Sequence, residues 1–120
     1  MRLGYSINVI IYNIWHLYYD EISKEVFVLI KATKIIMQSG KEKSNLVTEI
    51  ESIYLTGVEK EGFYTKERIY DFLKKDPKNE IKVNISPYPK LIPVLREQQK
   101  YVRSEANDTP NDNLLKLPRE

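Results

Sequence analysis

The amino-acid sequence predicts an α+β fold: a small sheet of about three to five strands, one central helix and a C-terminal helical turn. Three observations support this prediction. Residues 80–85, EIKVNI, alternate apolar and polar side chains with the period of a strand. Residues 65–75 place apolar side chains at helical spacing. Residues 109–118 combine helix-capping residues with leucines and close on a proline.

The first 45 residues differ in character from the rest of the chain. Residues 3–19 are rich in Ile, Val, Tyr and Trp, and their polar residues make them a poor transmembrane helix. A turn-like segment at residues 20–24 separates them from a second β-rich run at residues 25–36. We therefore expect residues 1–45 to be either an N-terminal β-hairpin or a disordered extension, with Met37 as an alternative start of the protein.

We assign residues 46–120 to one small α+β domain, which begins with a strand. The strand is expected over residues 49–58, where β-branched and aromatic side chains dominate. Gly57 ends this strand, and Gly62 lies in the turn expected before the helix.

The helix is expected to begin after Thr65 and to end at Asp76-Pro77. Thr65 can cap the helix N-terminus, and Tyr64 and Ile69 occupy the positions of a hydrophobic staple. The apolar face consists of Ile69, Phe72 and Leu73.

Two further strands follow the alternating segment at residues 80–85. Residues 91–99 form a strand that contains Pro93, so this strand must lie at an edge or carry a bulge. Residues 100–104 either continue it or form a separate short strand.

The last segment has the residues of an ordered, capped helical turn. Thr109 is a good N-cap, Pro110 suits the first helical position, and Asp112 completes a capping-box pattern. One helical turn is unstable alone, so its apolar side chains must dock on the fold as a lid or clasp. These side chains are Leu114, Leu115 and Leu117.

The string KYVRSEANDTPNDNLLKLP, residues 100–118, resembles the closing motif of the bacterial and phage family of unknown function number 3892. The resemblance covers roughly residues 46–118. It implies a small α+β domain and assigns no activity. The matching residues are Lys100, Tyr101, Val102, Arg103, Ser104, Asn107, Asp112, Asn113, Leu114, Leu117 and Pro118.

Composition argues against several classes of function. The chain has no cysteine and one histidine, His16, so we expect no transition-metal site, no cofactor and no thiol chemistry. Its four glycines are scattered and form no phosphate-binding loop. We therefore do not expect an enzyme. The absence of cysteine is typical of a reducing compartment, and we expect a cytoplasmic protein.

Two groups of residues are candidates for a binding site. Tyr101, Arg103, Asp112 and Asn113 are one group, since a guanidinium beside an acid and an amide can hold a carboxylate, a phosphate or a base edge. The alternative is that Arg103 pairs with Asp112 or caps backbone carbonyls, while Asn113 bonds the turn.

The second group would bind nucleic acid through aromatic and basic side chains on one sheet face. It consists of Tyr88, Lys90 and Lys100, together with Tyr101 and Arg103. Residues 46–120 carry 13 basic and 13 acidic residues, and this balance disfavours nucleic acid.

The leading functional hypothesis is a non-enzymatic binding or interaction module that uses an exposed strand edge or the surface of the C-terminal tail. An unknown protein is the expected partner. Weak nucleic-acid binding is one alternative, and membrane association through residues 3–19 is another.

Overall fold

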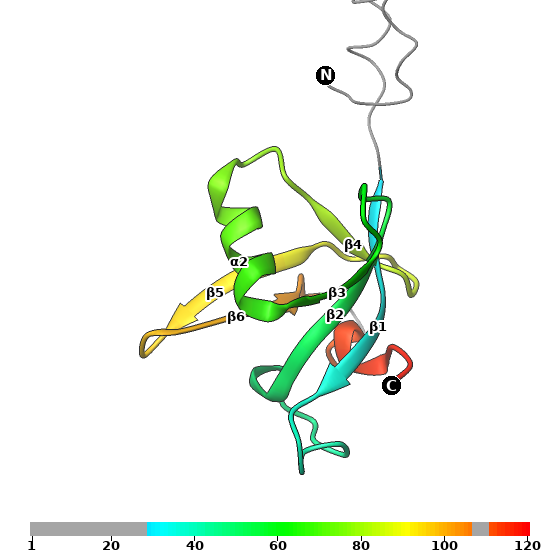
Figure 1. Ribbon diagram of the computed structural model, residues 1–120, viewed down its shortest axis with the longest axis vertical. Helices are drawn as coiled ribbons and strands as arrows, with labels where there is room; N and C mark the ends of the chain where they lie inside the picture. Colours follow the sequence, from blue (N-terminus) through cyan, green and yellow to red (C-terminus); the bar gives the residue numbers. More distant parts are fainter. Residues whose placement is uncertain (1–28, 107–110) are drawn as a thin grey trace, which may run out of the picture.

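The computed structural model describes residues 29–106 and 111–120, which form two sheets and one α-helix (Figure 1). The mixed α+β class predicted from the sequence is therefore confirmed. In chain order the elements are β1 (Ile30–Met37), η1 (Val47–Glu49), β2 (Ile50–Thr56), β3 (Gly62–Thr65), α2 (Lys66–Lys75), β4 (Ile81–Val83), β5 (Leu91–Arg96), β6 (Gln99–Ser104) and η2 (Asn113–Lys116).

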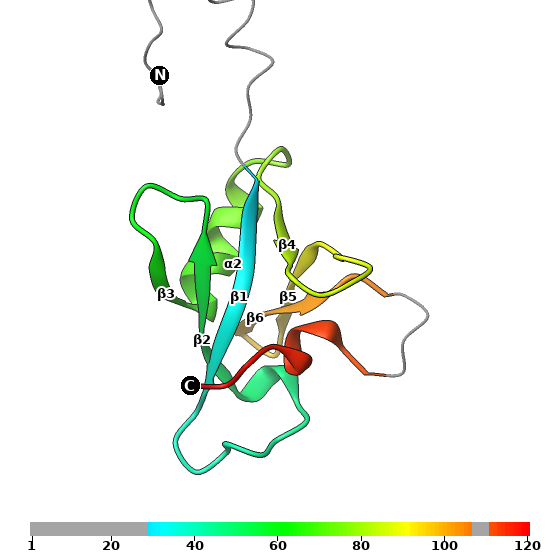
Figure 2. The same ribbon diagram turned by 90° about the vertical axis from the view of Figure 1, so that its right-hand side faces the viewer.

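The larger sheet has four strands in the order β3-β2-β1-β4. Strand β1 is antiparallel to β2 on one side and parallel to β4 on the other. The C-terminal residues extend the β4 side, because the Ile35 amide donates to Pro118 O at 2.9 Å and the Glu120 amide donates to Ile35 O at 2.9 Å. Strand β1 thus has main-chain partners on both edges, as Figure 2 shows.

Strands β5 and β6 form a separate antiparallel hairpin on which α2 packs. Glu97 and Gln98 connect them, with φ of +50° and +64°. Two positive φ values in a two-residue connection match the right-handed twist of the paired strands. A single antiparallel bridge between Lys82 and Lys90 joins β4 to the segment that enters β5.

One hydrophobic core joins the two sheets, the helix and the C-terminal turn. Ile35, Ile53 and Ile81 of the larger sheet are fully buried. Leu114 of η2 is also fully buried, and Ile69 of α2 is 2 % exposed. The rest of this core cluster consists of Ala32, Met37, Ile50, Leu55, Leu73, Val83, Leu91, Val102 and Leu117.

Helix α2 confirms the punctuation expected from the sequence. The Thr65 side chain accepts a hydrogen bond from the Arg68 amide at 3.3 Å, and the helix ends before Asp76. Ile69 and Leu73 are buried, whereas Phe72 is half-buried. The apolar stripe thus decides which face of the helix meets the hairpin.

The domain begins earlier than residue 46, which corrects the predicted boundary. Strand β1 stands inside the sheet, and its Ala32 and Ile35 are fully buried. A chain beginning at Met37 would lack this strand. Residues 3–19, the first strand of the predicted hairpin, lie outside the described residues.

Two local expectations also need correction, and one open alternative is decided. The segment from Gly62 is strand β3 rather than a turn, because it pairs with β2 through Leu55. Residues 100–104 belong to a separate strand, β6, which was one of the two alternatives. The C-terminal turn is a 3-10 helix whose N-cap is Asp112, whose side chain accepts from the Leu114 amide. Thr109 and Pro110 lie outside the described residues.

Replacing Leu114 by alanine tests how firmly the C-terminal turn is docked. Leu114 has no exposed surface, so we expect Leu114→Ala to lower the free energy of unfolding by about 2–4 kcal/mol in urea denaturation. Leu95 is 58 % exposed, and Leu95→Ala is the matched control, with an expected change within about 0.5 kcal/mol. Equal, small effects of both substitutions would show that the turn contributes nothing to stability.

Candidate functional site

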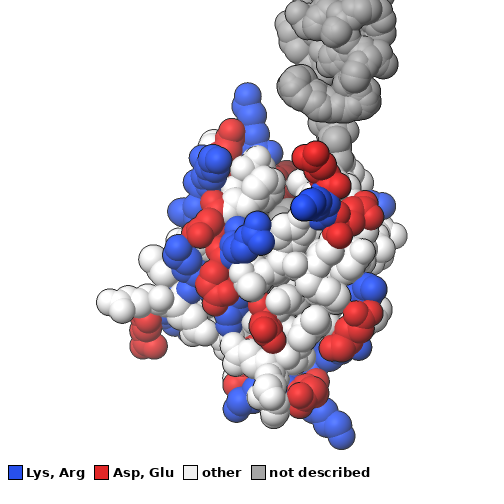
Figure 3. All heavy atoms as spheres, in the orientation of Figure 1, with Lys and Arg blue, Asp and Glu red and all other residues white. Residues whose placement is uncertain are grey.

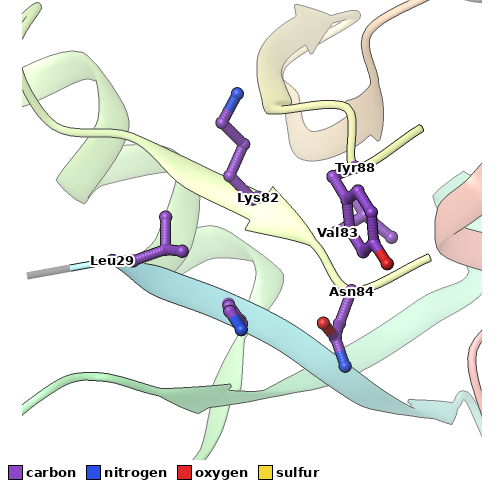
Figure 4. Close-up of a pocket in the computed structure, with 6 residues that line it drawn as sticks. Leu29, Lys82, Val83, Asn84 and Tyr88 are labelled. Carbon is purple, nitrogen blue, oxygen red and sulfur yellow. The ribbon is translucent and has the colours of Figure 1, made fainter. Parts of the chain in front are cut away.

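A surface groove of about 300 Å³ lies where the start of β1 meets β4 (Figure 4). It is named here the β1–β4 groove. Leu29 and Tyr88 flank it and are 51 % and 54 % exposed, two of the four large apolar side chains that are exposed among the described residues. Six residues line the groove: Leu29, Lys31, Lys82, Val83, Asn84 and Tyr88.

The two lysines of the groove are neighbours because of strand register. Lys31 of β1 is paired with Lys82 of β4 in the parallel ladder, so the two side chains leave the sheet on the same face. Lys82 Nζ lies 3.4 Å from Glu80 Oε2. Within residues 29–106 and 111–120, no carboxylate lies within ion-pair distance of Lys31.

Leu29 is held at the mouth of the groove by a close approach of two backbones. Gly57 has φ of +83°, and a Cβ added there would lie 2.2 Å from Leu29 O. Only glycine fits this position, because a side chain would clash with Leu29 O and would strain a backbone that has a positive φ. The turn after β2 can therefore press against the residue that opens β1.

Tyr88 has a backbone conformation that is rare for an aromatic residue, with φ of +60°. Its amide donates to Ile85 O at 2.7 Å, and Pro89 O next to it accepts from the Val83 amide at 2.8 Å. A non-glycine residue in this region costs roughly 1–3 kcal/mol and persists only where the surroundings impose it. The loop at residues 84–89 is thus fixed so that it presents an exposed ring.

Asn113 is one of the residues that impose this loop geometry. It is fully buried, and its Nδ2 donates to Ile85 O at 3.3 Å and to Ser86 O at 3.2 Å. A residue of the C-terminal motif therefore supports the loop that carries Tyr88. This is the role expected if Asn113 bonds a turn rather than a ligand.

The other residues of the first candidate group also have structural partners. Asp112 accepts from the Ser104 amide, at 3.0 and 3.2 Å to its two oxygens, and from the Leu114 amide at 2.9 Å. Arg103 is exposed, and its Nη1 donates to Ser104 O at 2.9 Å. Tyr101 is only 5 % exposed. The structure therefore does not gather Tyr101, Arg103, Asp112 and Asn113 into one exposed site.

The second candidate group is divided between two places. Tyr88 belongs to the β1–β4 groove, and Lys90 is bridged through its backbone to Lys82 of the same groove. Lys100 instead donates to Asp71 Oδ1 of α2 at 2.7 Å, with its Nζ 5.5 Å from the centre of the Tyr70 ring. The hydrogen bond to Asp71 raises the pKa of the Lys100 ammonium above its ordinary value.

Sequence reasoning did not single out five of the residues that line the groove: Leu29, Lys31, Lys82, Val83 and Asn84. The alternation of residues 80–85 does place Lys82 and Asn84 on one face of a strand. Their meeting with Leu29 and Lys31 depends on the parallel pairing of β1 with β4, for which the sequence carries no local signal. Only Tyr88 of the groove was among the candidates.

Charge on the surface is mixed in sign. Figure 3 shows basic and acidic side chains interspersed over the face drawn there. No cluster of three or more His, Asp or Glu side chains suited to a metal ion occurs in the described part of the chain. Across the same described residues, no helix has the length and apolar character needed to cross a membrane.

The Asn113 contacts to the loop at residues 84–89 predict a local effect that can be measured. Asn113→Ala removes the buried donor of two partly buried hydrogen bonds, so we expect a loss of about 1–3 kcal/mol in the free energy of unfolding. We also expect Asn113→Ala to increase the hydrogen-exchange rate of the Tyr88 amide more than the rates of amides in β2. Asn45→Ala, at an exposed position, is the control. If the substitution leaves the ratio of the Tyr88 exchange rate to the β2 rates unchanged, Asn113 does not hold the loop.

Comparison with known proteins gives one match. No curated protein and no solved structure matches the chain. A family model described as "Protein of unknown function (DUF3892)" matches residues 30–118, which run from the first residue of β1 to Pro118 beside β1. The match covers more than half of the chain and the whole of the two-sheet fold. The chain therefore belongs to the DUF3892 family of proteins of unknown function.

Proposed function

We propose that this protein is a non-enzymatic binding module whose ligand site is the β1–β4 groove. The observation that carries the proposal is the exposure of Leu29 and Tyr88 on the two sides of one hollow. Exposed apolar side chains that are gathered around a concave surface mark interaction sites. The strained backbone at Tyr88 supports the same conclusion, since such strain concentrates at binding sites.

The chemistry of the lining supports binding rather than catalysis. Two lysines, one amide and one phenol are the polar groups, and the lining contains no carboxylate and no histidine. General acid–base and nucleophilic catalysis need a nucleophile or base placed beside a partner that activates it. The groove offers cations and apolar surface, which can hold a ligand in place. His16, the one histidine, lies outside the described residues.

Nucleic-acid binding is the second candidate, and Tyr88 favours it. An exposed tyrosine beside Lys31 and Lys82 can stack on a base while the lysines face phosphate. Against it, Lys100, a candidate from the sequence, is paired with Asp71, and Lys82 of the groove is paired with Glu80, so fewer cations are available for phosphates. Membrane association through residues 3–19 and a cytoplasmic location remain predictions.

The proposed site can be tested with a neutral aromatic fragment. Titrating 3-phenylpropanamide into the full chain, we expect methyl NMR shifts concentrated at Leu29 and Val83. Tyr88→Ala removes a ring contact and should weaken binding roughly two- to tenfold. Leu95→Ala, which removes an exposed apolar side chain of β5 outside the lining, should leave binding unchanged.

The distribution of the shifts decides the outcome of this titration. Shifts at Leu29 and Val83 that need a higher fragment concentration in the Tyr88 variant support the groove as a binding site. Shifts of equal size at Leu46 and Leu95, the other two exposed leucines, would show that the fragment adheres to apolar surface in general and would refute the proposal.

A further inference from the structure

We infer that the β1–β4 groove binds an acidic peptide segment of a partner protein. An apolar side chain of the segment lies between Leu29 and Tyr88, and its carboxylates face Lys31 and Lys82. This inference rests on the proposed function and adds the chemical class of the ligand.

The positive charge of the groove is only partly compensated by carboxylates within the described part of the chain. Lys31 and Lys82 are direct register partners, and like charges in opposed positions destabilise a sheet. Glu80 lies 3.4 Å from Lys82 and compensates one of the two charges. The second positive charge has no carboxylate close to it among the described residues. A ligand carboxylate beside Lys31 would remove this repulsion.

The apolar part of the groove is matched to a single side chain. The volume of the whole groove, about 300 Å³, is at the lower end of ligand-binding pockets. Val83 forms part of the wall, and Leu29 and Tyr88 stand at the sides with about half of their surface exposed. The ligand is thus enclosed on one side and open on the other, as a residue within a longer chain requires.

Asn84 provides polar contact beside this apolar wall. Its side chain is exposed, and Figure 4 shows it at the end of β4 beside Tyr88. The backbone N–H of Asn84 already has a partner, since it donates to Ala32 O at 2.9 Å. The side-chain amide can both donate to a peptide carbonyl and accept from a peptide N–H. It therefore suits a peptide backbone that passes over the groove.

The same surroundings disfavour a nucleic acid. A single strand needs a track of cations for successive phosphates and several stacking rings. The lining of the groove has two lysines, Lys31 and Lys82, and one ring, that of Tyr88. This is fewer cations and rings than successive nucleotides require. One exposed ring beside two lysines fits one apolar peptide side chain with a carboxylate near it.

The experiment compares two synthetic peptides by fluorescence anisotropy with the full chain. In one, a phenylalanine stands between glutamates; in the other, glutamines replace the glutamates. We expect the acidic peptide to bind about fivefold more tightly, since two carboxylate–lysine contacts at a partly exposed site each contribute modestly. The difference should shrink as salt is added, because the groove is open to solvent.

Substitutions connect this preference to the groove. Lys31→Ala should weaken binding of the acidic peptide about two- to fivefold and leave the glutamine peptide unchanged. Lys31→Met keeps the length of the side chain without its charge and should give the same result. The control is Lys43→Ala, an exposed lysine in the loop beyond the other end of β1. Thermal unfolding establishes that each variant is folded.

Four results would overturn the inference. These are equal binding of the two peptides, an unchanged affinity of the Lys31 variants for the acidic peptide, an equal effect of Lys43→Ala, and tighter binding of single-stranded oligothymidine than of the acidic peptide. If neither peptide binds while 3-phenylpropanamide still shifts Leu29 and Val83, the ligand class is wrong and the proposed site stands. If the fragment also fails to bind the groove, the proposed function itself is wrong.

Discussion

The pairing of β1 on both of its edges is the constraint on which the rest of the structure depends. Its antiparallel ladder with β2 forms the floor of the core, and its parallel contact with β4 brings Lys31 beside Lys82. The hydrogen bonds of Ile35 to Pro118 and Glu120 fix the C-terminal turn against the same strand. Displacing β1 would leave main-chain donors and acceptors of β2, β4 and the C-terminal residues without partners. Buried main-chain groups must be paired, so this would be costly.

The C-terminal motif explains how the exposed loop at residues 84–89 is supported from inside the fold. Asp112 ties the end of β6 to the last turn, and Leu114 fills the core below them. Asn113 donates to Ile85 O and Ser86 O, so the motif supports the loop that carries Tyr88. Asp112 and Asn113, which the sequence offered as binding residues, thus have partners inside the fold, as polar side chains that leave the solvent require.

Local features of the structure were predictable, and the long-range ones were not. Capping at Thr65 and the alternation around Val83 depend only on residues close in the sequence, so the sequence could predict the helix and β4. Met37 was an alternative start of the protein, but it is the last residue of β1, and the residues after it connect two neighbouring strands of one sheet. The meeting of Lys31 with Lys82 depends on the tertiary pairing of distant segments, which no local pattern encodes.

The hydrogen bonds between β1 and residues 118–120 have a consequence for synthesis of the protein. The ribosome makes β1 first among the described strands, and the residues that complete its second edge come last. Until then, half of that edge has no partner, and an open strand edge is a template for pairing with another chain. Contacts between such distant parts of a sequence also form slowly. In nascent chains, the edge of β1 around Ile35 therefore stays open until residues 118–120 have followed.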